Sequence, residues 1–104
     1  MASTCWKTLE RDVAHLIGGR RHWANAGGTV DCESDRFTVQ CKLLRTCSLE
    51  TLTQLVEQAE ADGQRTGKLG LVAIKRRRGR GQPSPTLLVM TDRTFAAALG
   101  ADRG

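Results

Sequence analysis

Three polar residues, Asp31, Gln40 and Lys42, interrupt otherwise apolar stretches of the sequence. A carboxylate and neutral oxygen atoms are the ligands that Mg²⁺ prefers in proteins. A metal ion held in this way polarises a phosphoryl oxygen and lowers the pKa of a bound water. A neighbouring lysine orients the attacking water and offsets the charge that grows on the phosphate. If the chain brings the three side chains together, they favour metal-assisted hydrolysis of a phosphate ester.

Two strand-like segments carry these residues, a short one over 29–33 and a longer one over 36–43. Turn-forming residues separate the segments, so we predict that they pair as a β-hairpin. Side chains alternate between the two faces of a strand. The predicted faces of the longer segment are Phe37, Val39 and Cys41 on one side and Thr38, Gln40 and Lys42 on the other. Such a hairpin would place Asp31 near Gln40 and Lys42, with the backbone carbonyl of Cys41 as a further ligand.

The remaining elements are predicted from apolar periodicity, caps and turn residues. They are a helix that begins at Ser3 or Thr4 and stops at Gly18-Gly19, a strand over 20–24, a helix from Ser48 to Gly63, strands over 69–75 and 86–90, and a helix over 92–99. This order indicates an α/β (α+β) fold in a single domain over residues 1–104. We expect a central mixed sheet of four to five strands, flanked by helices.

Basic residues give the chain a formal net charge of +5, and many of them gather in an exposed loop predicted over about 76–85. A positive field of this kind favours a polyanionic partner, although a solvated basic loop is the simpler alternative. The candidate phosphate-binding residues are Arg20, Arg21, Lys75, Arg76, Arg77, Arg78 and Arg80. The chain has few aromatic residues, which argues against a platform that stacks single-stranded bases.

The four cysteines have no C-x-x-C spacing and no secretory signal precedes them, so we expect reduced thiols in the cytoplasm. No apolar run approaches the length of a membrane span. The sequence also contains no nucleotide-binding glycine loop and no Ser-His-Asp candidate. We therefore expect neither a membrane partner nor a nucleotide cofactor.

The segment 30–33, followed by the run Phe37-Thr38-Val39-Gln40-Cys41-Lys42, resembles the motif of PD-(D/E)XK nucleases. In particular it is similar to small Holliday-junction-resolvase-like and phage nucleases, over about residues 9–99. The resemblance includes Glu10 in the first helix and the small residues that precede Asp31. It implies a restriction-endonuclease-like αβββαβ core, a DNA substrate, and Mg²⁺ as cofactor with Mn²⁺ able to substitute. The implied catalytic residues are Asp31, Gln40, Lys42 and Glu10.

Gln40 departs from the motif, which usually has an acid at this position. The change removes one negative charge from the expected metal site, and we hypothesise that Glu33, Glu10 or both replace it. Glu33 is two residues from Asp31, so on a strand both would face the same side. The simpler alternatives are that Glu10 is a solvated helix residue and that Glu33 is a solvent-facing neighbour of the turn.

The leading expectation is a Mg²⁺-dependent DNA endonuclease that selects branched duplexes such as Holliday junctions, in recombination or phage genome processing. Since so short a chain covers little duplex, we expect a homodimer, in the host cytoplasm if a phage encodes it. One alternative is a catalytically inactive DNA-binding module that keeps the nuclease fold. Another is a small basic RNA-associated protein, favoured if Asp31 and Lys42 lie far apart.

Overall fold

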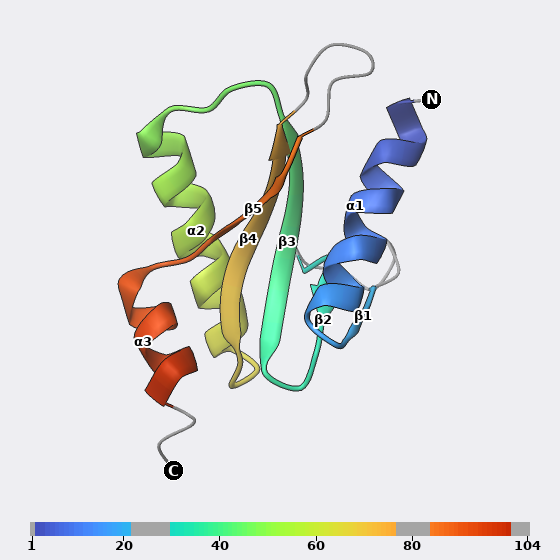
Figure 1. Cartoon of the computed structure of the whole chain (residues 1–104). Coiled ribbons are helices and arrows are strands. Elements are labelled where there is room, and N and C mark those ends of the chain that lie inside the picture. The colour runs from blue at the N-terminus through green and yellow to red at the C-terminus, as the bar shows by residue number, and fades with distance from the viewer. Residues whose placement is uncertain (1, 22–29, 77–83, 101–104) are drawn as a thin grey trace.

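The computed structural model describes residues 2–21, 30–76 and 84–100, and it shows three helices around a five-stranded mixed sheet within those ranges (Figure 1). The elements are α1 (Ala2–Leu16), β1 (Arg20–Arg21), β2 (Cys32–Glu33), β3 (Phe37–Leu44), α2 (Leu49–Gln64), β4 (Leu69–Arg76), β5 (Thr86–Val89) and α3 (Asp92–Gly100). This order confirms the α/β class predicted from the sequence. None of the described helices has the length and apolarity needed to cross a bilayer.

The five strands lie side by side in chain order, from β1 at one edge to β5 at the other. β3 and β4 are parallel, and the other three pairs are antiparallel. The predicted hairpin is present, because Cys32 pairs with Val39 and Glu33 with Thr38. The parallel pair needs a crossover, which α2 supplies.

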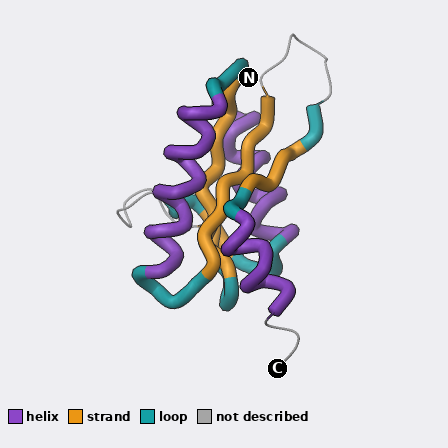
Figure 2. Tube along the Cα trace, turned by 90° about the vertical axis from the view of Figure 1, so that its left-hand side faces the viewer, coloured by secondary structure: helices purple, strands orange, loops and turns teal. Residues whose placement is uncertain are grey.

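The helices cover opposite faces of the sheet, with α1 on one face and α2 on the other (Figures 1 and 2). The buried cluster on the α1 face consists of Leu9, Val13, Ala14, Cys32, Val39, Cys41, Leu71 and Ala73. The cluster on the α2 face consists of Val56, Ala59, Val72 and Ile74. Alternating residues of β3 and β4 thus serve two small cores, as the alternation in the longer hairpin strand predicted.

α2 lies unusually close to β4, and Gly70 makes this approach feasible. A Cβ atom at Gly70 would stand 1.8 Å from the carbonyl oxygen of Ala59 in α2, which no side chain can tolerate. The helix begins where the sequence predicted, since the Ser48 side chain accepts a hydrogen bond from the Thr51 amide. It ends at Gln64, and Gly67 then turns the chain with a φ of 72°.

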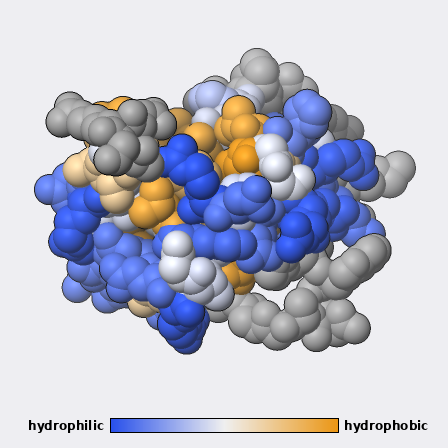
Figure 3. All heavy atoms as spheres, turned by 90° about the horizontal axis from the view of Figure 1, so that it is seen from below, coloured by the Kyte–Doolittle hydropathy of each residue, from blue (hydrophilic) through white to orange (hydrophobic). Residues whose placement is uncertain are grey.

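Several predicted boundaries need correction. α1 already begins at Ala2, so Ser3 and Thr4 are helical residues and neither is the cap. It ends close to the predicted stop, and Gly18 has a φ of 69°. The strand β2 has two residues, which is shorter than predicted, and β1 covers the first two residues of the strand predicted over 20–24, whose other positions lie outside the described residues. Seen from below, the hydrophobic surface of the molecule is broken by hydrophilic residues (Figure 3).

Candidate active site

Asp31 lies one residue before β2, and its side chain continues the hydrogen bonding of β3 where the strand β2 stops. The Cys41 amide donates a hydrogen bond of 2.8 Å to Asp31 Oδ2, and the Asp31 amide donates one of 2.9 Å to the Val39 carbonyl. The N–H and C=O groups of one strand residue point to the same side. The carbonyl of Cys41 therefore faces the Asp31 side. We call residues Cys41–Leu44 the open edge of β3, since no described strand pairs with them on this side.

Glu10 approaches the same edge from α1. Its side chain is buried, with the residue 3% exposed, and its Oε1 accepts a hydrogen bond from Arg21 Nε at 3.1 Å and forms an ion pair with Arg21 Nη2 at 3.0 Å. Burial raises the pKa of Glu10 above its ordinary range, and the neighbouring Asp31 carboxylate raises it further, whereas Arg21 opposes both effects. Two carboxylates and one arginine thus meet beside the Cys41 carbonyl.

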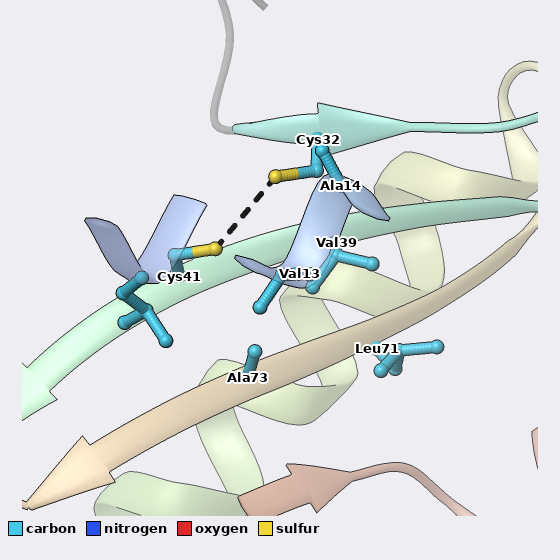
Figure 4. Close-up of a cluster of buried hydrophobic side chains, with 8 residues drawn as sticks. Val13, Ala14, Cys32, Val39, Cys41, Leu71 and Ala73 are labelled. Atoms are coloured by element: carbon cyan, nitrogen blue, oxygen red, sulfur yellow. Dashed lines mark hydrogen bonds between the residues drawn. The ribbon is translucent and has the colours of Figure 1, made fainter. Parts of the chain in front are cut away.

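Two buried thiols, those of Cys32 and Cys41, point toward each other in the cluster between α1 and the sheet (Figure 4). Cys32 Sγ lies 3.9 Å from Cys41 Sγ and 3.2 Å from the Glu10 backbone carbonyl, to which it donates. The hydrogen bond with Cys32 and burial both raise the pKa of the Cys41 thiol, so this group stays protonated. The same hydrogen bond lowers the pKa of Cys32, but both thiols are buried, so the pair packs beneath the site.

The expectation that the hairpin joins Gln40 to Asp31 in one site is not met, because the Gln40 amide is bound to Asp62 and the Asp31 carboxylate to the Cys41 amide. Gln40 Nε2 donates to Asp62 Oδ2 at 3.2 Å, on the α2 face, and is buried there. Asp62 also accepts from Gln58 Nε2 at 3.2 Å and forms an ion pair with Arg65. The reason is that Asp31 precedes the paired residues of β2, so the alternation of a strand does not direct its side chain.

Lys42 follows the same alternation as Gln40. It pairs in register with Ile74, which belongs to the α2-face cluster, and it is half-buried. The side chain of Lys42 therefore leaves β3 on the face opposite Glu10. Its backbone is nevertheless adjacent to Cys41, at the open edge.

Glu33 also lies apart from Asp31. Its carboxylate contacts Lys68 Nζ at 2.5 Å and Arg20 Nη2 at 3.5 Å. The expectation that Glu33 faces the same side as Asp31 is therefore wrong, again because Asp31 is not a strand residue. Of the two acids proposed to compensate for Gln40, the structure brings only Glu10 to Asp31.

The described basic residues lie at two places on the surface. Arg20 and Arg21 lie at the edge of the sheet beside Glu10 and Glu33, and Arg20 is strongly exposed. Lys75 is half-buried and Arg76 exposed at the end of β4. Arg77, Arg78 and Arg80, which the sequence placed in the basic loop, lie outside the described residues, as do most of positions 76–85.

The donor set can be compared with the needs of a metal ion. The described residues contain no group of three or more His, Cys, Asp or Glu side chains arranged to hold one. Mg²⁺ needs less than this, since it is usually held by one or two carboxylates and retains several waters. Asp31, Glu10 and the Cys41 carbonyl supply hard oxygen donors of this kind, so they fit Mg²⁺ or Mn²⁺. Gln40 and Glu33 are not part of the set.

A second buried carboxylate, Glu60 in α2, was not singled out by the sequence. It accepts hydrogen bonds from Arg93 Nη2 at 2.7 Å, Thr91 Oγ1 at 2.7 Å and Thr94 Oγ1 at 3.2 Å. The hydrogen bond from Arg93, followed by that from Thr91, lowers the pKa of Glu60 below its ordinary range. Asp62 was missed as well, although an acid beside the apolar stripe of α2 is a signal of burial with a partner.

Comparison of the chain with protein-family models, curated proteins and solved structures finds no match.

Proposed function

We propose that this protein is a metal-dependent DNA endonuclease whose active site is the open edge of β3. The observation that carries the proposal is the pair of carboxylates, Glu10 and Asp31, beside the Cys41 carbonyl. The Asp31 carboxylate disfavours the charge of the buried Glu10 carboxylate, and a bound cation removes this cost. The αβββαβ order of the core supports the proposal.

Asp31, Glu10 and the Cys41 carbonyl would hold Mg²⁺, and Mn²⁺ would substitute. When bound, the metal supplies Lewis acidity toward a phosphoryl oxygen and an activated water. Asp31 is held in place for this role by the hydrogen bond from the Cys41 amide. Glu10 is held by Arg21, which fixes the carboxylate without saturating it, since both contacts are with Oε1.

Arg21 and Lys42 are two cations at this edge. Arg21 uses Nε and Nη2 for Glu10, which leaves further guanidinium N–H groups for a phosphate. Lys42 begins one residue beyond Cys41, and its four-carbon stem is flexible enough to reach a phosphate at the edge from the α2 face. In this arrangement the two cations approach the scissile phosphate from opposite faces of the sheet.

The substrate class follows from charge. The chain carries a formal net charge of +5, and Arg20 and Arg76 are exposed cations. Such groups neutralise backbone phosphates without reading sequence, so binding should weaken steeply with salt. The finer proposal, which rests on the resemblance described above, is selectivity for branched duplexes such as four-way junctions, in the cytoplasm.

The proposal is tested by cleavage of supercoiled plasmid and of labelled four-way junctions with Mg²⁺ or Mn²⁺. We expect nicking by the wild type and its loss in Asp31→Asn, Glu10→Gln and Lys42→Ala. Glu33→Gln is the matched control, because it removes an acid from the neighbouring strand without touching the Glu10–Asp31 pair. Cleavage by Asp31→Asn at the wild-type rate would overturn the site.

A second candidate function, DNA binding without cleavage, is favoured by one observation. Gln40 and Lys42 lie on the α2 face, and the Gln40 amide is already bound to Asp62. This candidate predicts salt-sensitive DNA binding and no cleavage with any divalent metal. Restoring the acid by Gln40→Glu separates the two: cleavage that appears only in this variant supports a lost activity, whereas an active wild type excludes it.

A further inference from the structure

The strand β5 forms an apolar edge of the sheet, and Pro85 shields only the end at which the strand begins. Its four residues, Thr86–Val89, carry no charge, and they pair with β4 on one side only. Leu87 is 53% exposed and Leu88 is 42% exposed. Soluble proteins usually shield such an edge with charges, a proline or a bulge, because a bare edge pairs with another strand.

The two leucines lie on opposite faces of the sheet. Leu87 pairs with Ile74, whose side chain belongs to the α2-face cluster, so Leu87 projects on that face. Leu88 pairs with Ala73 of the α1-face cluster and projects on the other. The edge therefore presents apolar surface on both of its faces, which a neighbouring strand can cover and a helix on one face cannot.

A cavity of about 300 Å³ opens on the α2 face next to this edge. Its apolar lining comes from the first half of α2, the end of β5 and the residue after it: Leu49, Leu52, Val56, Val89 and Met90. The rest of the lining is polar and consists of Thr53, Glu57, Thr91, Asp92 and Arg93. Leu49 is 78% exposed, so the cavity is open to solvent at the start of α2. A site of this kind accepts one apolar side chain that enters beside Val89.

We propose that a second copy of this chain pairs with β5 in antiparallel orientation, centred on Leu88, and inserts its Leu87 into the cavity. A twofold axis perpendicular to the sheet keeps like faces together, and directly opposed residues of an antiparallel pair share a face. Only residues of the same face can therefore oppose each other. The register centred on Leu88 places Leu87 of the second copy opposite Val89 of the first, at the cavity. By symmetry, Leu87 of the first copy lies at the cavity of the second.

Charge complementarity supports the same register. With Leu88 at the centre, Thr86 of one copy opposes Met90 of the other. Lys75 pairs with Thr86 within its own chain, so it and the adjacent Arg76 approach the start of α3 in the second copy. Asp92 is exposed at that point, and the charge of the neighbouring Arg93 is paired with Glu60 of its own chain. Opposite charges thus meet at both ends of the shared strand pair, which offsets the repulsion between two basic chains.

The oligomeric state tests the proposal. Sedimentation equilibrium of the full chain over a range of concentrations should show a reversible dimer. Leu87→Arg should raise the dissociation constant at least about tenfold, as expected for loss of a buried anchor. The matched control is Leu16→Arg on α1, which is also an exposed leucine (62%) and should leave the dimer unchanged. A wild type that is monomeric at every concentration, or a dimer indifferent to Leu87→Arg, overturns the proposal.

A cysteine cross-link tests the register separately. In a background with Cys5→Ser and Cys47→Ser, Leu88→Cys should form an intermolecular disulfide with oxidised glutathione, because residue 88 faces its own copy across the axis. Leu87→Cys is the control and should remain a thiol. A link at 87 in place of 88, or no link at 88, overturns this register. Circular dichroism confirms that each variant is folded, and none of these readouts depends on DNA cleavage.

Discussion

Two buried glutamates, one on each side of the sheet, have opposite environments. Glu60 on the α2 side is surrounded by donors from Thr91, Arg93 and Thr94, and these lower its pKa. Glu10 on the α1 side has one arginine as donor, and its neighbour Asp31 is a second acid, so its pKa is raised. Both carboxylates are nearly inaccessible, yet only one of them is fully satisfied by the protein.

This difference distinguishes a carboxylate that serves the fold from one that is proposed to bind a ligand. The hydrogen bonds to Glu60 hold α3 against α2. They occupy both of its carboxylate oxygens, so this group needs no ligand. The Glu10–Asp31 pair has one arginine for two carboxylates, and a perturbed acid beside another acid is typical of a functional site. The missing charge is what a divalent cation would supply. The comparison is the physical basis for placing the active site at the open edge of β3.

The largest effect should be on catalysis. We expect Glu10→Gln to lower the rate of DNA cleavage by about a hundredfold or more, since the variant keeps the shape but loses the charge of a metal ligand. Glu60→Gln should change the rate by less than about threefold, because Glu60 serves packing. The measurement is single-turnover cleavage of a labelled junction. Equal losses in the two variants would erase the distinction between the glutamates.

The second effect is on the free energy of unfolding. Here the Glu60 variant should lose more than the Glu10 variant. Glu60→Ala removes the common acceptor of Thr91, Thr94 and Arg93, and we expect a loss of about 2 kcal/mol in the free energy of unfolding. The arginine is largely exposed, which limits the loss through solvent screening. Glu10→Gln should be neutral or stabilising in metal-free buffer. Urea denaturation measures both, and a Glu10→Gln variant that loses more than Glu60→Ala would contradict the comparison.

A metal ion should stabilise the folded protein through Glu10 and Asp31 and not through Glu60. At about ten times its dissociation constant, Mg²⁺ should add about 1.4 kcal/mol to the free energy of unfolding of the wild type. Glu10→Gln and Asp31→Asn should abolish this gain, whereas Glu60→Gln should retain it. Thermal melts with and without Mg²⁺ or Mn²⁺ provide the measurement. A gain that persists in Asp31→Asn would place the ion elsewhere.

The smallest effect is on the pH dependence of stability. The contributions of Glu10 and Glu60 to it should have opposite signs. The raised pKa of Glu10 means that its unfavourable contribution grows as pH rises from about 4.3, the ordinary value, through the folded pKa. The lowered pKa of Glu60 means that its favourable contribution is present above the ordinary value and is lost as pH falls through the folded pKa. Relative to wild type, Glu10→Gln should therefore gain stability with rising pH, and Glu60→Gln should lose it. Curves of the same sign would refute the assignment of environments.

The elements of the fold were predictable because their signals are local. Apolar spacing in α1 and α2, the Ser48 cap and the turn between β2 and β3 each depend on a few neighbouring residues. Helix phase left open whether Glu10 is buried or solvated, and the structure buries it next to Leu9 and Val13. The order of elements then indicated the mixed sheet.

The arrangement of the site was only partly predictable. Alternation correctly placed Gln40 and Lys42 on one face, but it was extended to Asp31, which lies one residue outside the strand. Its side chain follows the Cys41 amide instead. The contact between Gln40 and Asp62 joins residues far apart in the sequence, and no local pattern contains it.

The most direct test of the account is a crystal structure of the protein soaked with Mn²⁺, with the ion located by its anomalous scattering. We predict a single peak at the open edge of β3, bound by the carboxylates of Asp31 and Glu10 and by the Cys41 carbonyl. A peak on the α2 face at Gln40 and Asp62, or no peak at saturating Mn²⁺, would contradict it.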